Sequence, residues 1–367
     1  MWGIKSRGHK MMGRVACGAM ALAATLALAG CSLLTPSRAN EEPEATLTKL
    51  TTPTIATKGV LTVGLPSESA PLVMTDDEGQ LTGYTVDVAR ALAKNLGLKV
   101  TFVTGARVGD TGGSAAPDIY LGATADDADS TISVEGEFLQ DASAIYGRAD
   151  AAASAGENTS AISADTLSGA TIAVQTGSAA QDALSKCGID ATQKPCSNVN
   201  DCLAAVASGE ADYAAVGASA GSYLARAYGD VRLVGTIDDA TAYGAAVRTM
   251  NADLAQAISD ALSELASDGT LDAIHAAWFG TAPRDLSDML AAGITTSAQR
   301  AAAEQAAEDA GDAEGAGGEA GDDSPVNSAG DTSASAGASD TGSGSYASDA
   351  GSTDFSVPSD SLYAPGL

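Results

Sequence analysis

Aromatic residues, histidine and positive charge are all scarce in this chain of 367 residues. Phe, Trp and Tyr make up 4% of the sequence, and of its 2 histidines only His275 lies outside the first 30 residues. Catalysis that needs an imidazole, or a metal ion held by histidines, has almost no residues to use. We therefore expect a protein that is not an enzyme and that carries no metal and no other cofactor.

Positive charge is the second shortage. Lys and Arg total 19 against 47 Asp and Glu, for a formal net charge of −28, and no Lys or Arg follows Arg300. Such an acidic surface repels phosphate backbones, so we expect no nucleic-acid partner. Residues 301–310 have helical propensity, but beyond Gly311 the chain is mostly Gly, Ser, Ala and Asp, which predicts a disordered acidic tail.

Long hydrophobic runs are confined to the N-terminus. Basic residues between Lys5 and Arg14 precede the apolar run 15–29, which is too short to span a bilayer and is typical of a secretory signal. The run ends in Leu28-Ala29-Gly30-Cys31, which resembles the lipobox of bacterial lipoproteins. That resemblance implies removal of residues 1–30 and a diacylglycerol on Cys31. The alternative is an ordinary signal peptide that contains a cysteine.

The exported chain would then sit on the outer face of the bacterial cell membrane, held by its lipid. Residues 31–56 are rich in Thr, Pro and Glu and predict a flexible tether.

Besides Cys31, three cysteines remain in the exported part, an odd number for an oxidising compartment. We expect one disulfide and one free thiol. Cys196 should end a strand and Cys202 should lie in the first turns of the next helix, at one end of a lobe, whereas Cys187 should end the preceding helix. This placement favours a Cys196–Cys202 bridge and leaves the other pairings open.

Apolar periodicity predicts alternating strands and helices. Residues 60–65 read as a strand, Val88, Leu92 and Leu96 recur at helical spacing, and 98–102 alternate as a second strand, which together form a βαβ unit. A second set of α/β elements begins near Ala170. Two helices with apolar stripes follow Asn251 and Thr270. The expected fold class is α/β.

Three blocks of sequence resemble the family-3 extracellular solute-binding proteins of ABC importers. The first block is a strand, a Pro-containing loop and Gly-Tyr-x-Val-Asp before a helix. The second leads into the turn Gly177-Ser178, and the third combines a hinge strand with Asp-Gly-Thr-Leu and Trp-Phe-Gly. The blocks are 58–64 with Pro71 and 79–89, then 167–178, then 243–248 with 268–271 and 278–280.

The resemblance implies a two-lobed, type II periplasmic-binding-protein-like fold. Each lobe would be a mostly parallel sheet flanked by helices, with hinge strands near 144–152 and 240–247 and the ligand clamped between the lobes. The implied organisation is a first lobe at 57–147 and 242–282, a second lobe at 148–241, and a tail at 283–367.

The implied function is a monomeric, lipid-anchored binding protein that delivers a small polar solute to the permease subunits of an ABC transporter. A diverged scaffold that serves as a non-transport surface sensor or interaction module is the alternative. The stretch 217–221 also matches the G-x-S-x-G motif of hydrolases, with Asp238 or Asp239 and His275 as partners for Ser219. His275 lies inside an expected helix beside an apolar stripe, which disfavours this reading.

The ligand-pairing residues of the resembled family are missing. Its amino-acid binders hold the ligand carboxylate with an arginine about a dozen residues after the match of Asp118, where this chain has Asp129 or Ser130. They hold the ammonium with an acid where this chain has Gly217, and they stack an aromatic ring where it has Ser69. Because an α-amino acid needs both charges paired, we expect free α-amino acids to bind poorly.

The candidate ligand-binding residues follow from that comparison. The helix N-terminus at Gly177-Ser178 favours an anion or a carbonyl oxygen, and Glu68, Asp126 and Asp129 would favour a cationic or neutral polar solute. The full set is Ser69, Thr124, Asp129, Gly177, Ser178, Gly217 and Ser219.

Overall fold

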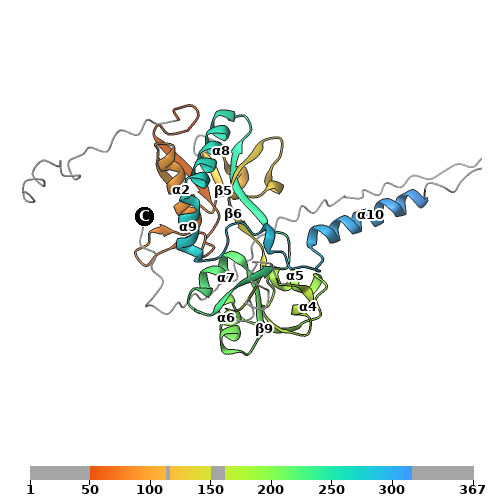
Figure 1. The fold of residues 1–367 in the computed structure, drawn as a ribbon. Helices are drawn as coiled ribbons and strands as arrows, with labels where there is room; N and C mark the ends of the chain where they lie inside the picture. The colour runs from red at the N-terminus through yellow and green to blue at the C-terminus, as the bar shows by residue number, and fades with distance from the viewer. Residues whose placement is uncertain (1–49, 113–115, 150–161, 316–367) are drawn as a thin grey trace, which may run out of the picture. The chain divides into compact units, whose positions relative to one another are not determined.

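The computed structural model describes residues 50–112, 116–149 and 162–315 (Figure 1). The predicted signal peptide, the lipidation site Cys31 and the tail beyond residue 315 lie outside these ranges. Within them, no helix is long and apolar enough to cross a membrane. Leu50 and Ile55 are buried in the core, and the Ala56 N–H donates to Asp118 Oδ1 at 2.8 Å. The tether prediction is therefore wrong for 50–56, because these apolar side chains pack into the fold.

The first sheet has five strands in the order β4-β1-β5-β12-β6. β1 pairs in parallel with β4 and β5, and β12 runs antiparallel to β5 and β6. Helices α2, α8 and α9 pack against one another beside this sheet (Figure 1). The elements are β1 (Val60–Leu65), β4 (Lys99–Thr104), β5 (Ile119–Ala123), β6 (Ile132–Asp141), β12 (Thr241–Arg248), α2 (Tyr84–Asn95), α8 (Ala252–Ser267), α9 (Thr270–Phe279) and the hairpin β2 (Met74–Thr75) and β3 (Leu81–Thr82).

The second sheet also has five strands, in the order β11-β7-β10-β8-β9. β8 pairs in parallel with β9 and β10, whereas β7 is antiparallel to β10 and β11. Each parallel strand leads into a helix. The elements are β7 (Ser143–Arg148), α4 (Ala164–Leu167), β8 (Thr171–Gln175), α5 (Ala179–Lys186), β9 (Thr192–Cys196), α6 (Val199–Ser208), β10 (Tyr213–Gly217), α7 (Ala218–Ala225) and β11 (Val231–Thr236).

Local sequence accounts for these elements. The Asn198 side chain accepts from the Asp201 N–H at 2.8 Å and begins α6, which ends at Gly209 in the left-handed conformation at φ 78°. In α8, the stripe predicted from the sequence is the buried face, namely Leu254, Ile258, Leu262 and Leu265. The helix and strand patterns in 60–102 and 171–216 are confirmed in the same way.

The chain passes from the first sheet to the second at Ala142, between the end of β6 and the start of β7. It returns between Thr236 and Thr241. The structure places the first crossing before the predicted hinge at 144–152, because residues 143–148 pair with β10 and β11 of the second sheet. No glycine or proline marks Ala142 as the point of crossing.

A third connection follows α9, which we call the return segment, residues 281–296. The Leu286 N–H donates to Gln140 Oε1 of β6 at 2.7 Å, and the Ala291 N–H donates to the Thr236 carbonyl at 2.9 Å. Leu286 and Ala291 are buried. The prediction that the tail begins at residue 283 is therefore wrong, because this segment is bonded to both sheets.

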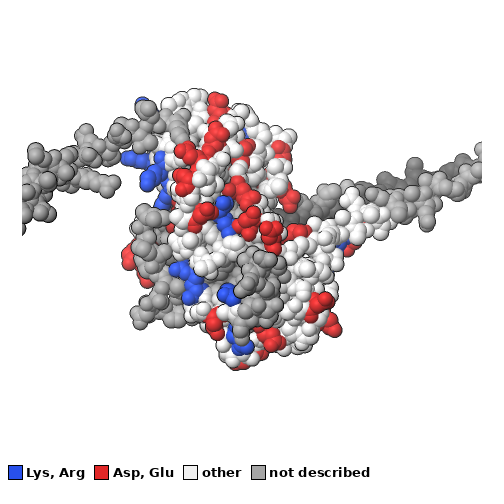
Figure 2. All heavy atoms as spheres, viewed as in Figure 1, with Lys and Arg blue, Asp and Glu red and all other residues white. Residues whose placement is uncertain are grey.

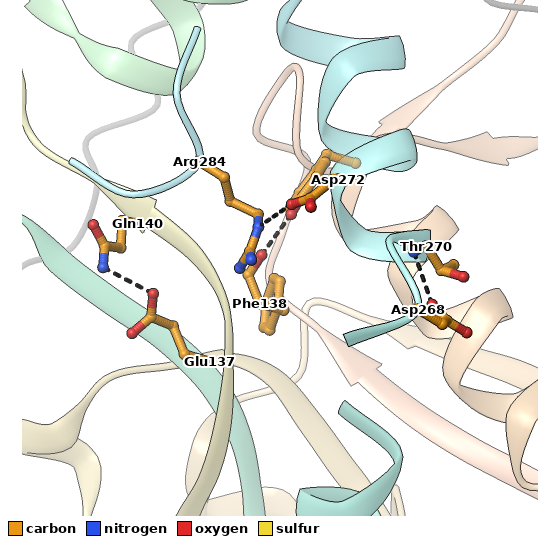
Figure 3. Close-up of polar contacts among 8 residues, drawn as sticks. Glu137, Phe138, Gln140, Asp268, Thr270, Asp272 and Arg284 are labelled. Carbon is orange, nitrogen blue, oxygen red and sulfur yellow. Dashed lines mark hydrogen bonds and ion pairs between the residues drawn. The ribbon is translucent and has the colours of Figure 1, made fainter. Parts of the chain in front are cut away.

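The start of the return segment lies over α9 and β6. Arg284 points toward Asp272 of α9 and forms an ion pair with it at 2.8 Å, with Gln140 and Glu137 of β6 nearby (Figure 3). The segment ends at α10 (Ser297–Gly315), which confirms the predicted helix at 301–310. On the face drawn in Figure 2, acidic side chains are most dense over α8, α9 and β6.

Candidate functional site

The candidate residues follow the carboxyl ends of parallel strands in both sheets. Ser69 lies in the loop after β1, and Thr124 comes directly after β5. Gly177 and Ser178 follow β8, while Gly217 ends β10 and Ser219 lies in the first turn of α7. Ligands of α/β folds bind beyond the carboxyl ends of parallel strands. The candidates therefore occupy the right edge of each sheet.

In the first sheet, most of the candidate polar groups are used inside their own loop. The Thr124 N–H and hydroxyl both contact Asp127 Oδ2, at 2.7 and 3.1 Å. Asp129 Oδ1 accepts from the Thr131 N–H, the Thr131 hydroxyl and the Ile132 N–H at 2.6, 2.8 and 2.8 Å. The hydrogen bonds from Thr131 and Ile132 hold the pKa of Asp129 below its ordinary value. Asp129 thus stabilises a turn.

Arg248 is the arginine that the structure brings near Asp129, whose pKa it lowers further. Its guanidinium is already engaged, since Nε donates to the Thr111 carbonyl at 2.6 Å and Nη2 to the Gly109 carbonyl at 2.9 Å. Arg248 and Thr111 line a hollow of about 420 Å³ at the end of β12 away from Thr241, together with Ser130 and Met250. Although it is the larger hollow described, it holds only Ser130 of the positions compared with the family.

In the second sheet, Ser178 is the N-cap of α5. Its hydroxyl donates to the Gln175 carbonyl at 2.8 Å and accepts from the Gln181 N–H at 3.2 Å. The Gly177 N–H donates to Gln181 Oε1 at 2.8 Å. The Gly177 amide that we expected to receive an anion is therefore satisfied within the protein.

Helix α7 begins differently, because its N-cap Gly217 has no side chain to offer. Asp141, the last residue of β6, takes that place: its Oδ1 accepts from the Ser219 N–H at 3.0 Å and from the Ala142 N–H at 2.9 Å. The Ala218 N–H donates to the Ala142 carbonyl at 2.9 Å. A carboxylate is favourable at this positive end of a helix. Sequence reasoning missed Asp141, since nothing in its neighbourhood separates it from the other acids.

Burial raises the pKa of the Asp141 carboxyl, and hydrogen bonds from Ser219, Ala142 and Ala218 oppose that increase. Ser219 is 6% exposed. Its hydroxyl lies close enough to Asp141 to lower that pKa, yet Ser219 Oγ has no hydrogen-bond partner among the described residues. A buried hydroxyl without a partner is uncommon in native proteins and calls for an explanation.

Two tyrosines of this region, Tyr120 and Tyr243, have pKa values that nearby acids raise. Burial raises the pKa of Tyr120 to about 12, with Asp127 and then Tyr243 adding to the effect. Burial also raises the pKa of Tyr243, followed by the charges of Asp141 and Asp127. A hollow of about 290 Å³ opens beside this loop, lined by Ala125, Ala128, Val134, Gly136, Ala242 and Gly244.

The hydrolase triad considered from the sequence is not assembled in the described residues. Asp238 Oδ1 accepts from the N–H and hydroxyl of Ser297 at 2.8 and 2.9 Å. His275 packs edge-on against Tyr84 and lies against Phe279 in the core. Ser219 Oγ, as noted, bonds neither of them.

The cysteines of the second lobe are free thiols in the structure, which therefore does not contain the predicted Cys196–Cys202 bridge. The two thiols are nevertheless neighbours. Burial, a side-chain hydrogen bond with Cys196 and the Cys196 charge all raise the pKa of Cys202, so it stays protonated and unreactive as a nucleophile. Cys187 is buried, and its thiol donates to the Leu184 carbonyl at 3.3 Å.

Comparisons with known proteins agree with the sequence blocks. Residues 61–109 match the model of the bacterial extracellular solute-binding proteins, family 3. The L-cystine-binding protein TcyJ of Escherichia coli strain K12 is 28% identical over 228 residues, which cover 61% of this chain and 84% of TcyJ. This likeness extends well beyond the first lobe.

Two solved structures show the same fold. The unliganded open L-cystine solute receptor of Neisseria gonorrhoeae matches with a TM-score of 0.51 at 24% identity, covering 62% of this chain and 95% of the receptor. A polar amino acid ABC uptake transporter substrate-binding protein from Streptococcus thermophilus matches with a TM-score of 0.52 at 16% identity, covering 62% and 88%. The predicted type II periplasmic-binding-protein-like fold is confirmed.

Proposed function

We propose that this chain is a family-3 extracellular solute-binding protein that delivers a small amino-acid-type solute to the permease subunits of an ABC transporter. The similarity to TcyJ carries the proposal, because it extends over 228 residues and 84% of TcyJ. Family membership implies an extracytoplasmic location. A hinge between two α/β lobes allows capture by rigid-body closure, with no covalent chemistry.

L-cystine is the first solute to test, since it is the ligand named for TcyJ. The chain departs from the amino-acid binders where they pair the ligand carboxylate, because Asp129 holds its own turn and Arg248 holds backbone carbonyls. Our expectation that ordinary α-amino acids bind poorly therefore stays a prediction. A solute with a further polar or cationic group fits the acidic surroundings better.

The binding experiment uses residues 32–367, so that Leu50 and the return segment keep their places in the fold. Isothermal titration with L-cystine, followed by a thermal-shift screen of amino acids, polyamines, sugars and short peptides, identifies the solute class. A ligand at 100 times its Kd stabilises the folded state by about 2.7 kcal/mol, which a melting curve resolves. No shift with any solute would contradict the transport proposal.

A non-transport surface sensor or interaction module is the second candidate. The observation that favours it is the loss of both ligand-pairing residues, with Asp129 or Ser130 and Gly217 at their positions. Deleting the gene and measuring solute uptake separates the two. Unchanged uptake of every solute that binds in the screen would favour the sensor.

We also propose that Cys31 carries the lipid that anchors the protein. Stable attachment needs buried methylene groups, each contributing about 0.8 kcal/mol. A Cys31→Ser variant should be secreted into the medium or remain uncleaved. If it stayed membrane-bound through a high-salt wash and was cleaved normally, the anchor proposal would be wrong.

A further inference from the structure

Two polar groups at the start of α7 retain unused bonding capacity. Ser219 Oγ is buried and has no partner among the described residues. The Ser219 and Ala142 N–H groups donate to Asp141 Oδ1, and a carboxylate with about four acceptor sites can accept from a further donor. The two groups come from different lobes, since Asp141 ends β6 of the first sheet and Ser219 lies in α7 of the second.

The surroundings of this pair are acidic. Asp141 and Asp127 both raise the pKa of Tyr243, which is half-buried in β12 between them. In the described part of the chain, no Lys or Arg is among the groups that shift the pKa values of Tyr120, Asp141 or Tyr243. A positive group at this pair would therefore meet the Asp141 carboxylate, with no Lys or Arg among the groups that shift its pKa.

An ammonium group has the bonding pattern that this place lacks. It offers three donors and no acceptor, while the Asp141 carboxylate and Ser219 Oγ both accept. Hydrogen bonds from an ammonium to a carboxylate are shorter and about twice as strong as neutral ones. An unpaired buried hydroxyl destabilises the protein until a donor or acceptor reaches it.

We propose that Asp141 and Ser219 form a subsite that receives an ammonium group of the bound solute. The inference rests on the proposed function and narrows it to solutes that bear a primary amine. Because Asp141 belongs to the crossing between the sheets, an amine bound there contacts both lobes at their connection.

Three matched probes test the subsite in residues 32–367 by isothermal titration. L-cystine has two ammonium and two carboxylate groups, cystamine keeps only the ammonium groups, and dithiodipropionate keeps only the carboxylates. We expect cystine and cystamine to bind and dithiodipropionate not to bind. The intact mass after each titration gives the fraction of protein in which the probe has exchanged onto a thiol. The protein concentration used in the fit is reduced by that fraction.

The Asp141→Asn variant should bind cystine and cystamine on the order of a hundredfold more weakly, as expected when one partner of a close charge pair is neutralised. Asparagine keeps the Oδ1 acceptor for the Ser219 N–H, so α7 keeps its cap. Asp260→Asn, which neutralises an exposed acid of α8 outside the subsite, is the matched control and should bind as the parent does. Ser219→Ala is the second variant, with an expected loss of about tenfold.

The outcomes separate the two proposals. Parent protein that binds cystine while Asp141→Asn and Ser219→Ala bind it equally well would overturn the subsite alone. Preference for dithiodipropionate over cystamine would do the same. If the parent binds none of the three probes, the cystine-type solute of the proposed function is wrong, and the subsite is wrong with it. Melting curves without ligand check that each variant is folded.

Discussion

The two sheets are built on the same plan, but their strands lead into different structures. In the second sheet, β8, β9 and β10 each lead into a helix of eight or more residues. In the first sheet, β4 and β5 lead only to short 3₁₀ turns, Val108–Asp110 and Ala125–Asp127. The second lobe thus presents helix N-termini at its strand ends, whereas the first presents short turns bonded to their own acids.

The difference shows which polar groups are left for a ligand. Asp110 and Asp127 cap their own turns, and Ser178 and Asn198 cap their own helices. Among the helices that follow β8, β9 and β10, α7 is the exception, because Gly217 has no side chain and the cap comes from Asp141 on the other lobe. The proposed subsite lies where a helix of the second sheet takes its cap from the other lobe.

The largest predicted effect comes from a substitution that disrupts the packing of α7 against β7. Gly221 lies against the Tyr146 ring, and an added Cβ would overlap that ring. The Tyr146 hydroxyl also contacts the Ala218 carbonyl and the Ser222 hydroxyl, each at 2.7 Å. Gly221→Ala should lower the free energy of unfolding by about 3 kcal/mol through overpacking.

Urea unfolding followed by circular dichroism measures this loss. Gly229→Ala is the matched control, since Gly229 has no atom within 4 Å of its added Cβ and no positive φ. It should be neutral or slightly stabilising. Equal stability of the two variants would show that α7 does not pack tightly on Tyr146.

Sequence reasoning was most accurate where one face of an element is apolar. The stripe in α8 has a clear helical period, the strands at 60–65 and 171–174 are short apolar runs, and burial follows from both patterns. The return segment could not be found this way. Its buried residues, Leu286 and Ala291, do not recur at helical or strand spacing and so have no period to detect.

The site was only partly predictable for a related reason. The strand-end positions of Thr124, Gly177 and Gly217 follow from fold resemblance, but whether a hydroxyl or amide is free depends on its partner. Gln181 satisfies Gly177 and Asp127 satisfies Thr124 within a few residues. Asp141 reaches Ser219 across 78 positions of sequence, which no local pattern records.

A second prediction uses acid to weaken the first lobe before the second. Burial, followed by the charge of Arg284, lowers the pKa of His275 to about 4. Its ordinary value of 6.5 applies in the unfolded chain, so the unfolded state takes up the proton first and stability falls as pH drops from about 6.5 to about 4. The loss should be about 2 kcal/mol over this window.

Urea unfolding at several pH values checks this dependence, with His275→Leu as the comparison. Leucine has no proton to take up, so the stability of the variant should change less between pH 6.5 and 4. Identical slopes for the two proteins would mean that His275 is not buried as a neutral side chain.

A third prediction acts on the second lobe alone. Oxidation should join Cys196 and Cys202, whose thiols are neighbours, and leave Cys187 free. A bridge that closes so short a loop should add about 2 kcal/mol to the stability of the oxidised protein. Peptide mapping after alkylation identifies the pair. A bridge that includes Cys187 would contradict the placement of Cys196 beside Cys202.

The smallest expected effect concerns the attachment of the return segment to α9. Arg284 and Asp272 are both partly exposed, with side-chain exposures of 28% and 64%. Exposed ion pairs contribute little, so Arg284→Gln should change the free energy of unfolding by less than about 1 kcal/mol.

The pKa of His275 should respond more clearly to Arg284→Gln, because Arg284 lowers it. His275 is the single histidine of residues 32–367, so its ring protons give one resolved NMR signal to titrate. We expect that signal to titrate at higher pH in Arg284→Gln and to be unchanged in Arg232→Gln, which alters an arginine of the second sheet. An unshifted titration in Arg284→Gln would place the return segment away from α9.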